Sequence, residues 1–437
     1  MRTRAIFLCL LLFTSLEAKN DSLVKLCEHG IKNNPRIKSY THRVSASHSV
    51  YDQSVDQYKP HFDMSGQYGR QNYQYESVSG IRPYNGLSYN YQFTLKQPVY
   101  RAQLLHMMTD ARAKEKLTRL QEKDEKAKLI TQILQTSVEL IRQKKIVVIL
   151  QKKTVLLEKA YATIVDRYNI KLASGTDKSQ SLAKLEQSRA ELIKAKQIYA
   201  YNLYNLRLLT KYENVEKYIS KLSFNITAVE KAYRKANFLN LRKNMRNNTR
   251  IMLDEQSTKI AKIQIGLRNS ERSPKLDAVL SYGDAGGTID YVTRRNDSRA
   301  MLQLSFPIYQ GGYVDDRVKE AKFLYMAAQE DTENTRLNIE ISMEKTMQDI
   351  KGGIASVKAQ KSAVAASKKY FEGTVESYKN GMQSLTDVYL AESDYYDNQL
   401  RLINNESDLI LSVVGMYYYI GKSDLKYVGQ VQNKYFK

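Results

Sequence analysis

The 437-residue sequence contains no tryptophan, only six prolines and only two cysteines. No proline lies between Pro98 and Pro274, and none follows Pro307. A proline inside a helix costs about 3 kcal/mol, because it removes a hydrogen bond and clashes with the preceding turn. The two proline-free tracts therefore permit helices much longer than those of ordinary globular domains.

The scarcity of cysteine limits the covalent chemistry of the chain. A basic start, the apolar run Ala5–Phe13 and a plausible cleavage point at Ala18 predict a signal peptide over residues 1–18. This segment contains Cys9, so its removal leaves Cys27 as a single cysteine without an intramolecular partner. A lone thiol of this kind is usually a small, buried apolar residue.

Long hydrophobic runs are also missing. No segment reaches the roughly 18 consecutive apolar residues of a transmembrane helix, so none is expected. The net charge is +22, but lysine and arginine alternate with acidic residues along helical stretches. This pattern is typical of solvated helix faces, and we expect no nucleic-acid partner. A basic, helical nucleic-acid-binding protein is therefore the weakest of the hypotheses considered.

Signals for chemistry are absent from the sequence. The five histidines show no metal-ligand spacing, and neither a glycine-rich phosphate loop nor a Ser, His and Asp grouping stands out. We therefore expect no enzyme, no catalytic residues, no metal site and no cofactor.

Helical periodicity fills both proline-free tracts. Ile130, Leu134, Val138 and Ile141 recur on one helix face, and strong helix formers lie between them. A helix over about 101–170 would measure roughly 105 Å, followed by a break and a returning helix to about 210. The second tract repeats this pattern over about 313–420, with a break at Asn380 and Gly381. Helices this long must bury their apolar stripes against one another, as coiled coils do.

Short amphipathic strands precede each long helix. The sequence LSYNYQFTLKQ over 87–97 alternates apolar and polar residues, which is the period of a half-exposed strand. Hairpin strands are predicted over about 61–97, with a loop near 83–86, and over about 275–306. The residues predicted to face lipid are Leu87, Tyr89, Tyr91, Phe93, Leu95, Leu276, Leu280, Tyr282, Leu302 and Leu304.

The two halves form an internal repeat. PHFDMSGQYG from Pro60 matches PKLDAVLSYG from Pro274, and YNIKLASGTD from Tyr168 matches YKNGMQSLTD from Tyr378, each about 210 residues apart. We therefore divide the chain into a first repeat over 19–210 (hairpin 61–97, helices 101–210) and a second over 227–421 (hairpin 275–306, helices 313–420). The segments 211–226 and 422–437 lie outside the repeats; the family resemblance described below implies that both belong to one equatorial region.

A four-stranded sheet with one apolar face cannot seal itself in a bilayer. Lipid satisfies no backbone hydrogen bonds at a sheet edge, so a spanning sheet must close into a barrel. Three chains would supply twelve strands, enough for a water-filled barrel. The alternative is a periplasmic coiled-coil scaffold whose hairpins cap a helical bundle without a membrane span.

The sequence FPIYQGG over 306–312, together with this repeat, resembles the TolC-like outer-membrane efflux protein family. The resemblance implies a mainly α fold with transmembrane β, in which a trimeric 12-stranded β-barrel continues into a 12-helix α-barrel tunnel. It implies a bacterial outer-membrane homotrimer that passively conducts substrates for efflux or type I secretion. A periplasmic adaptor, an inner-membrane transporter and outer-membrane lipid would be its partners. The strand-to-helix motif comprises Pro98, Tyr100, Phe306, Pro307, Tyr309, Gly311 and Gly312.

The same resemblance places a closed entrance at the two helical turns. Asp387 matches an acidic ring at the pore constriction, although Leu390 stands where the family often has a second aspartate. Tyr378 matches a gate tyrosine, and Gln383 replaces an arginine of the family's gate network. Tyr168 and Asp177 occupy the equivalent positions of the first repeat, where helix capping is the favoured role of Asp177.

Overall fold

The computed structural model describes residues 22–77, 80–220, 222–236, 238–287 and 294–436. The predicted signal peptide lies outside them. The helices are α1 Ser22–Asn33, α2 Pro35–Asp56, α3 Ala102–Asn169, α4 Gly175–Thr210, α5 Val215–Ile219, α6 Ile226–Arg234, α7 Phe238–Asn244, α8 Thr249–Asn269, α9 Tyr313–Lys379, α10 Leu385–Tyr419 and α11 Leu425–Tyr435. The strands are β1 His61–Ser77, β2 Gly80–Arg101, β3 Lys275–Gly287 and β4 Arg294–Ser305.

The chain divides into two compact units. The first comprises Met1–Lys38, Asp124–Asn248 and Asn338–Lys437, and the second comprises Ser39–Lys123 and Thr249–Leu337. The long helices α3 and α9, of 68 and 67 residues, contribute to both units. Each unit thus draws on both sequence repeats, because equivalent segments of the repeats pack together.

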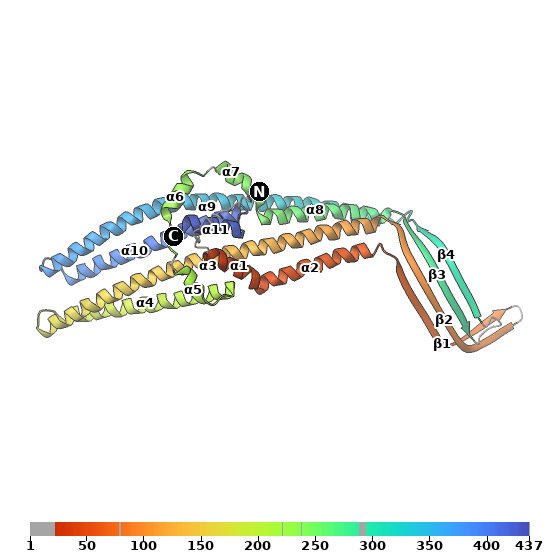
Figure 1. Cartoon of the computed structure of the whole chain (residues 1–437), viewed down its shortest axis with the longest axis horizontal. Coiled ribbons are helices and arrows are strands. Elements are labelled where there is room, and N and C mark those ends of the chain that lie inside the picture. Colours follow the sequence, from red (N-terminus) through yellow and green to blue (C-terminus); the bar gives the residue numbers. More distant parts are fainter. Residues whose placement is uncertain (1–21, 78–79, 221, 237, 288–293, 437) are drawn as a thin grey trace, which may run out of the picture. The chain divides into compact units, whose positions relative to one another are not determined.

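The first unit contains two antiparallel helical hairpins, α3 with α4 and α9 with α10 (Figure 1). Within the first, the hydroxyls of Thr154 and Ser188 lie 2.9 Å apart. Within the second, Gln360 Nε2 donates to Asn398 Oδ1 at 2.8 Å. The first hairpin also pairs with the second through α3 and α10, where Arg142 donates to Asp408 at 2.7 Å. By pairing in this way, the long helices bury their apolar faces against one another without a surrounding globular domain.

The shorter helices of this unit pack against its hydrophobic core. The backbone of Phe224 forms an isolated antiparallel bridge with Phe436, and their rings lie 6.0 Å apart. Gln432 of α11 accepts a hydrogen bond from the backbone N–H of Leu23 at 2.8 Å. Cys27 is fully buried here, and burial raises the pKa of its thiol well above the usual value. The prediction that Cys27 is a buried apolar residue is confirmed.

The second unit contains one antiparallel sheet in the order β1-β2-β3-β4. Strand β2 has 22 residues where the prediction was a strand over about 87–97, and β1 has 17 residues where the prediction was about 61–73. The predicted loop near 83–86 was wrong, because Pro83 pairs with Gln74 inside the β1–β2 ribbon. Among the described residues, β3 reaches only as far as Ser88 along β2, so no described strand lies beside the Pro83 backbone on that side. A strand position open on one side tolerates the missing N–H of a proline.

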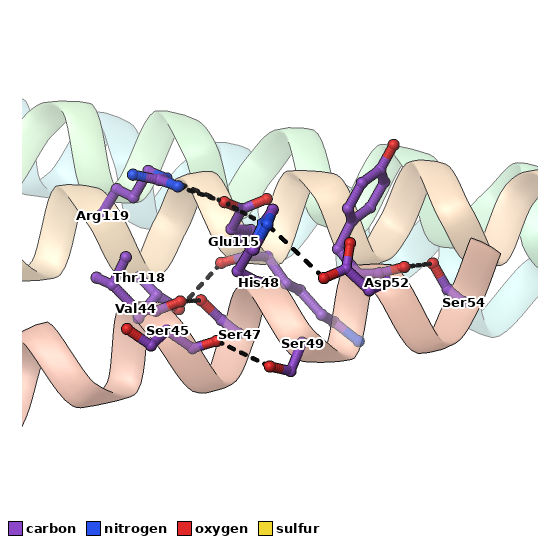
Figure 2. A network of polar contacts seen from close by, with 12 residues as sticks. Val44, Ser45, Ser47, His48, Ser49, Asp52, Ser54, Glu115, Thr118 and Arg119 are labelled. Carbon is purple, nitrogen blue, oxygen red and sulfur yellow. Dashed lines mark hydrogen bonds and ion pairs between the residues drawn. The ribbon is translucent and has the colours of Figure 1, made fainter. Parts of the chain in front are cut away.

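Polar contacts fix α2 against α3 within the second unit (Figure 2). His48 Nδ1 lies 3.3 Å from Glu115, and Arg119 lies 2.6 Å from the same carboxylate. The hydrogen bond from Arg119, aided by His48, lowers the pKa of Glu115. The carboxylate therefore stays ionised and holds one side chain from each helix.

Candidate functional site

The two turns that join the long helices have the same backbone geometry. In the first, the Leu172 N–H donates to the Arg167 carbonyl at 2.7 Å, and Lys171 has a φ of 64°. In the second, the Met382 N–H donates to the Ser377 carbonyl at 2.9 Å, and Gly381 has a φ of 74°. Both are Schellman ends, in which a left-handed residue satisfies the last helical carbonyls. The sequence repeat therefore extends to the hydrogen bonds of each turn.

A capping box starts the returning helix in each repeat. Ser174 donates from its backbone N–H (3.0 Å) and its hydroxyl (2.8 Å) to Asp177. Ser384 donates to Asp387 in the same way, at 3.0 Å and 2.7 Å. Such boxes satisfy the free N–H groups of the first helical turn. The structure thus gives Asp177 its expected capping role and gives Asp387 an identical one that the sequence analysis did not assign.

The capping contacts also govern the charge of Asp387. Hydrogen bonds from the Ser384 hydroxyl and backbone lower the pKa of its carboxyl. Its position near a helix N-terminus favours negative charge as well. Asp387 is therefore an ionised, partly exposed carboxylate, and its predicted place at a pore constriction is compatible with its capping role.

The predicted gate residues do not form one network within the chain. Arg167 of α3 donates to the Tyr378 hydroxyl at 3.1 Å, and its guanidinium lies 5.6 Å from the Tyr378 ring. Tyr168, by contrast, is exposed and has Lys178 4.8 Å from its ring centre. Gln383 is exposed in the second turn. The structure thus joins Tyr378 to a neighbouring helix through Arg167, which the sequence analysis missed.

The sequence analysis also missed a buried carboxyl close to the second turn. Glu392 of α10 is only 3% exposed. It follows Leu385 and Tyr389 on the stripe of α10 that packs against Leu157, Ile164 and Leu185. Burial raises the pKa of Glu392 to about 7. Its spacing of seven residues from Leu385 is the signal that could have identified it, because such positions share one helix face.

The register of the sheet brings the ten predicted lipid-facing residues to one face. Phe93 lies between Met64 and Tyr282, and Leu95 lies between Phe62 and Leu280. On the outer strand, Leu302 and Leu304 are 70% and 67% exposed. Strand β1 adds apolar residues to this face that the sequence analysis did not list, namely Phe62, Met64 and Tyr68. The result is a continuous apolar surface across all four strands.

Polar residues end this apolar surface where β3 ends and β4 begins. The Tyr91 hydroxyl donates to Asp284 Oδ2 at 3.0 Å, and Arg294 forms an ion pair with the same carboxylate at 2.8 Å. Within the described residues, β1 and β4 each pair with a strand on one side only. Long unpaired edges beside an exposed apolar face are a ready template for pairing with other chains.

The strand-to-helix motif differs between the two repeats. Pro98 and Tyr100 flank a register shift in the pairing of β2 with β3, and α3 begins directly after β2. In the second repeat, Gly311 and Gly312 take φ values of 59° and 82° before α9. Phe306 and Pro307 lie between β4 and these glycines, and Tyr309 is 87% exposed. This connection therefore presents apolar side chains to the surface.

None of the helices in the described part of the chain is both long and apolar enough to cross a lipid bilayer. The described residues also contain no group of three or more His, Cys, Asp and Glu side chains arranged to hold a metal ion.

Comparisons with known proteins identify the class to which this architecture belongs. A membrane protein from Pseudomonas aeruginosa matches it with a TM-score of 0.79 at 15% identity, covering 92% of this chain and 90% of that structure. The CmeC outer membrane channel of Campylobacter jejuni matches with a TM-score of 0.76 at 15% identity, covering 94% and 89%. These similarities show the fold, a mainly α tunnel fold with a β-sheet portion.

Sequence comparisons find similarity to one family of outer-membrane proteins. Residues 242–422 match the family model described as "Outer membrane efflux protein". Outer membrane protein TolC of Vibrio cholerae is 27% identical over 186 residues, covering 41% of this chain and 42% of that protein. TolC of Escherichia coli is 23% identical over 258 residues, covering 56% and 52%. The matches thus span about half the length of the curated relatives.

The chain is therefore similar to the TolC-like outer membrane efflux proteins in sequence over residues 242–422 and in fold over nearly its whole length. The resemblance inferred from the sequence is therefore confirmed. The similarity also supports the prediction that the protein is not an enzyme, because the channels of this family are conduits.

Proposed function

We propose that three copies of this chain form an exit duct across the bacterial outer membrane. As a TolC-like protein it belongs to that membrane, with its helices in the periplasm. The observation that supports this proposal is the four-stranded sheet, which has one apolar face. Within the described residues, its outer strands β1 and β4 each have one edge that pairs with no strand. Three such sheets would close into a 12-stranded β-barrel, which satisfies every edge hydrogen bond in lipid.

The helices would continue this barrel as a 12-helix tunnel. Each chain contributes two long hairpins; α3 begins directly after β2, and α9 begins after the seven-residue connection 306–312 that follows β4. The duct would conduct substrates passively, as expected of a protein similar to channels that are non-enzymatic conduits. A periplasmic adaptor and an inner-membrane transporter supply energy and cargo, for either efflux or type I secretion. One similar protein is the protease secretion protein PrtF of Dickeya chrysanthemi, which is 22% identical over 160 residues.

Single-channel recording tests this function. We expect the purified full-length protein to be a trimer in detergent and to produce unitary currents in a planar bilayer. It should also remain in the outer-membrane fraction after a high-salt wash. A stable monomer that conducts nothing and washes off in salt would instead support the periplasmic scaffold.

The acidic ring is tested by Asp387→Asn. If three Asp387 carboxylates converge in the pore, the substitution removes like charges that favour cations. The reversal potential across a salt gradient should then move toward zero, with a severalfold lower cation-to-anion permeability ratio. Asparagine keeps an oxygen that can accept from Ser384 but removes the negative charge near the helix N-terminus, so the start of α10 should also be slightly less stable.

Asp177→Asn is the matched control, because Asp177 has the same capping contacts in the first repeat. We expect the same loss of stability but unchanged ion selectivity. Equal selectivity in Asp387→Asn and the unaltered protein would refute the ring.

A further inference from the structure

A pocket of about 540 Å³ lies between the two helical hairpins, near their turns. Its walls come from the last turns of α3 and α9 and the first turns of α10. Apolar side chains dominate the lining, including Leu156, Ile164, Phe371 and Val375. Binding sites for small molecules usually have this volume and character, with a few polar groups that fix orientation.

One of those polar groups is the buried carboxyl of Glu392. Within the described residues, its Oε1 atom is buried and has no hydrogen-bond partner. A buried carboxylate without a partner costs considerable free energy, so a native example requires an explanation. The pocket beside it provides space for a group that would supply the missing partner.

Three cations around the pocket already have other partners. Lys153 pairs with Glu191 at 3.2 Å, and Lys379 pairs with Glu376 at 3.2 Å. Arg167 donates to the Tyr378 hydroxyl. Lys184 of α4 also attracts Glu392, but within the described residues no cation forms an ion pair with this carboxylate, which leaves it available to a ligand.

We propose that this pocket binds an organic cation with an apolar body, whose ammonium group pairs with Glu392. The apolar body would contact Leu156, Ile164 and Phe371, and the aromatic rings of Tyr378 and Tyr389 would lie beside the positive charge. Aromatic faces attract cations, which adds to the selectivity for positive charge. An anion of the same shape would meet the carboxylate and be excluded. The site uses groups of a single chain, so it goes beyond the proposed duct function and does not depend on it.

The charge of Glu392 gives the binding a pH dependence. Burial raises its pKa to about 7, so the carboxyl is neutral well below that pH and charged above it. Affinity for a permanent cation should therefore rise as the pH increases from 5.5 to 8.5. The charged and titratable groups that face Glu392 or line the pocket are Lys153 and Arg167 on α3, Lys184 and Glu191 on α4, Glu372, Glu376, Tyr378 and Lys379 on α9, and Tyr389, Tyr396 and Asp397 on α10.

Monodansylcadaverine is a suitable probe, because it combines a fluorescent naphthalene body with one primary ammonium group. Its N-acetyl derivative has the same body without the charge. We expect saturable binding to the full-length protein in detergent at pH 8.5, with a blue shift of the emission. The N-acetyl derivative should bind at least tenfold more weakly. This comparison needs no variant and is independent of channel activity.

Two variants separate the charge from the cavity. Glu392→Gln should weaken binding of the ammonium probe at least tenfold and remove its pH dependence. Ala160→Leu fills part of the lining and should weaken both probes while the carboxyl remains. Glu406 is a distant carboxylate on the same helix, so Glu406→Gln should change the binding of neither probe. The proposal is overturned if the N-acetyl derivative binds as tightly as monodansylcadaverine. It is also overturned if Glu392→Gln binds monodansylcadaverine as tightly as the unaltered protein does. A loss of binding with intact single-channel currents would support the site without affecting the proposed duct.

Discussion

Leu280→Arg should abolish assembly of the protein in the outer membrane. Leu280 is 50% exposed and lies between Leu95 and Ala300 on the apolar face of the sheet. If this face contacts lipid, an arginine at mid-depth costs roughly 2–4 kcal/mol per chain. Three chains carry this cost together in the proposed trimer, which exceeds the margin of most assemblies. Membrane fractionation and semi-native gels should show the protein outside the membrane and no trimer.

Ser281→Arg is the matched control, since neighbouring strand residues point to opposite faces. Ser281 pairs with Thr94 and Arg299 and belongs to the face expected to line a water-filled lumen. This variant should assemble normally and alter only conductance. If both variants assemble equally well, the apolar face does not contact lipid.

The second large effect is the stabilisation of the helical hairpins by Glu392→Gln at alkaline pH. The carboxyl has a pKa of about 7 in the folded chain, against about 4.5 for an ordinary glutamate. The folded state therefore holds its proton more tightly than the unfolded state does. Stability falls as the pH rises from about 4.5 to 7 and stays low above it. The loss amounts to roughly 3 kcal/mol at 1.36 kcal/mol per pKa unit.

Glutamine has no charge to desolvate, so the variant should lack this loss. Amide hydrogen exchange of α10, compared between the two proteins at each pH, reports the free energy of local opening. We expect little difference near pH 5 and a gain of about 2–4 kcal/mol in the variant at pH 8.5. The result would contradict the burial of Glu392 if the two proteins showed equal protection at every pH.

Glu406→Gln is the control, for which we expect the opposite change in stability. Glu406 lies on the same helix, but its carboxylate pairs with Lys145 at 3.4 Å and with Lys361 at 3.7 Å. Removing a paired, partly exposed charge should cost up to about 1 kcal/mol rather than stabilise the helix.

Local patterns allowed much of the helical architecture to be read from the sequence. The expected helix over about 101–170 corresponds to α3, Ala102–Asn169, and the expected break near Gly381 corresponds to the turn before α10. Helix hydrogen bonds join residues four apart, so proline gaps, periodicity and turn residues suffice to locate such elements. The strand ends were less accurate, because their lengths depend on partners far along the chain. Pro83, expected in a loop, has a strand partner across the β1–β2 ribbon.

The candidate site also contains one contact that the local sequence predicts and one that it does not. Asp387 begins α10 in a Ser-x-x-Asp box that is visible in the sequence, although its equivalence to Asp177 was not used to assign its cap. The partner of Tyr378, in contrast, is Arg167 on a different helix, and no local pattern links the two.

The sequence alone determined that this protein is a duplicated chain of long helices and amphipathic strands, because proline spacing, periodicity and turn chemistry act over a few residues. Only the tertiary structure decided which charges are buried and which side chains meet. The carboxyl of Glu392 loses its water only where α10 packs against the α3–α4 hairpin, and desolvation depends on neighbours from distant parts of the chain.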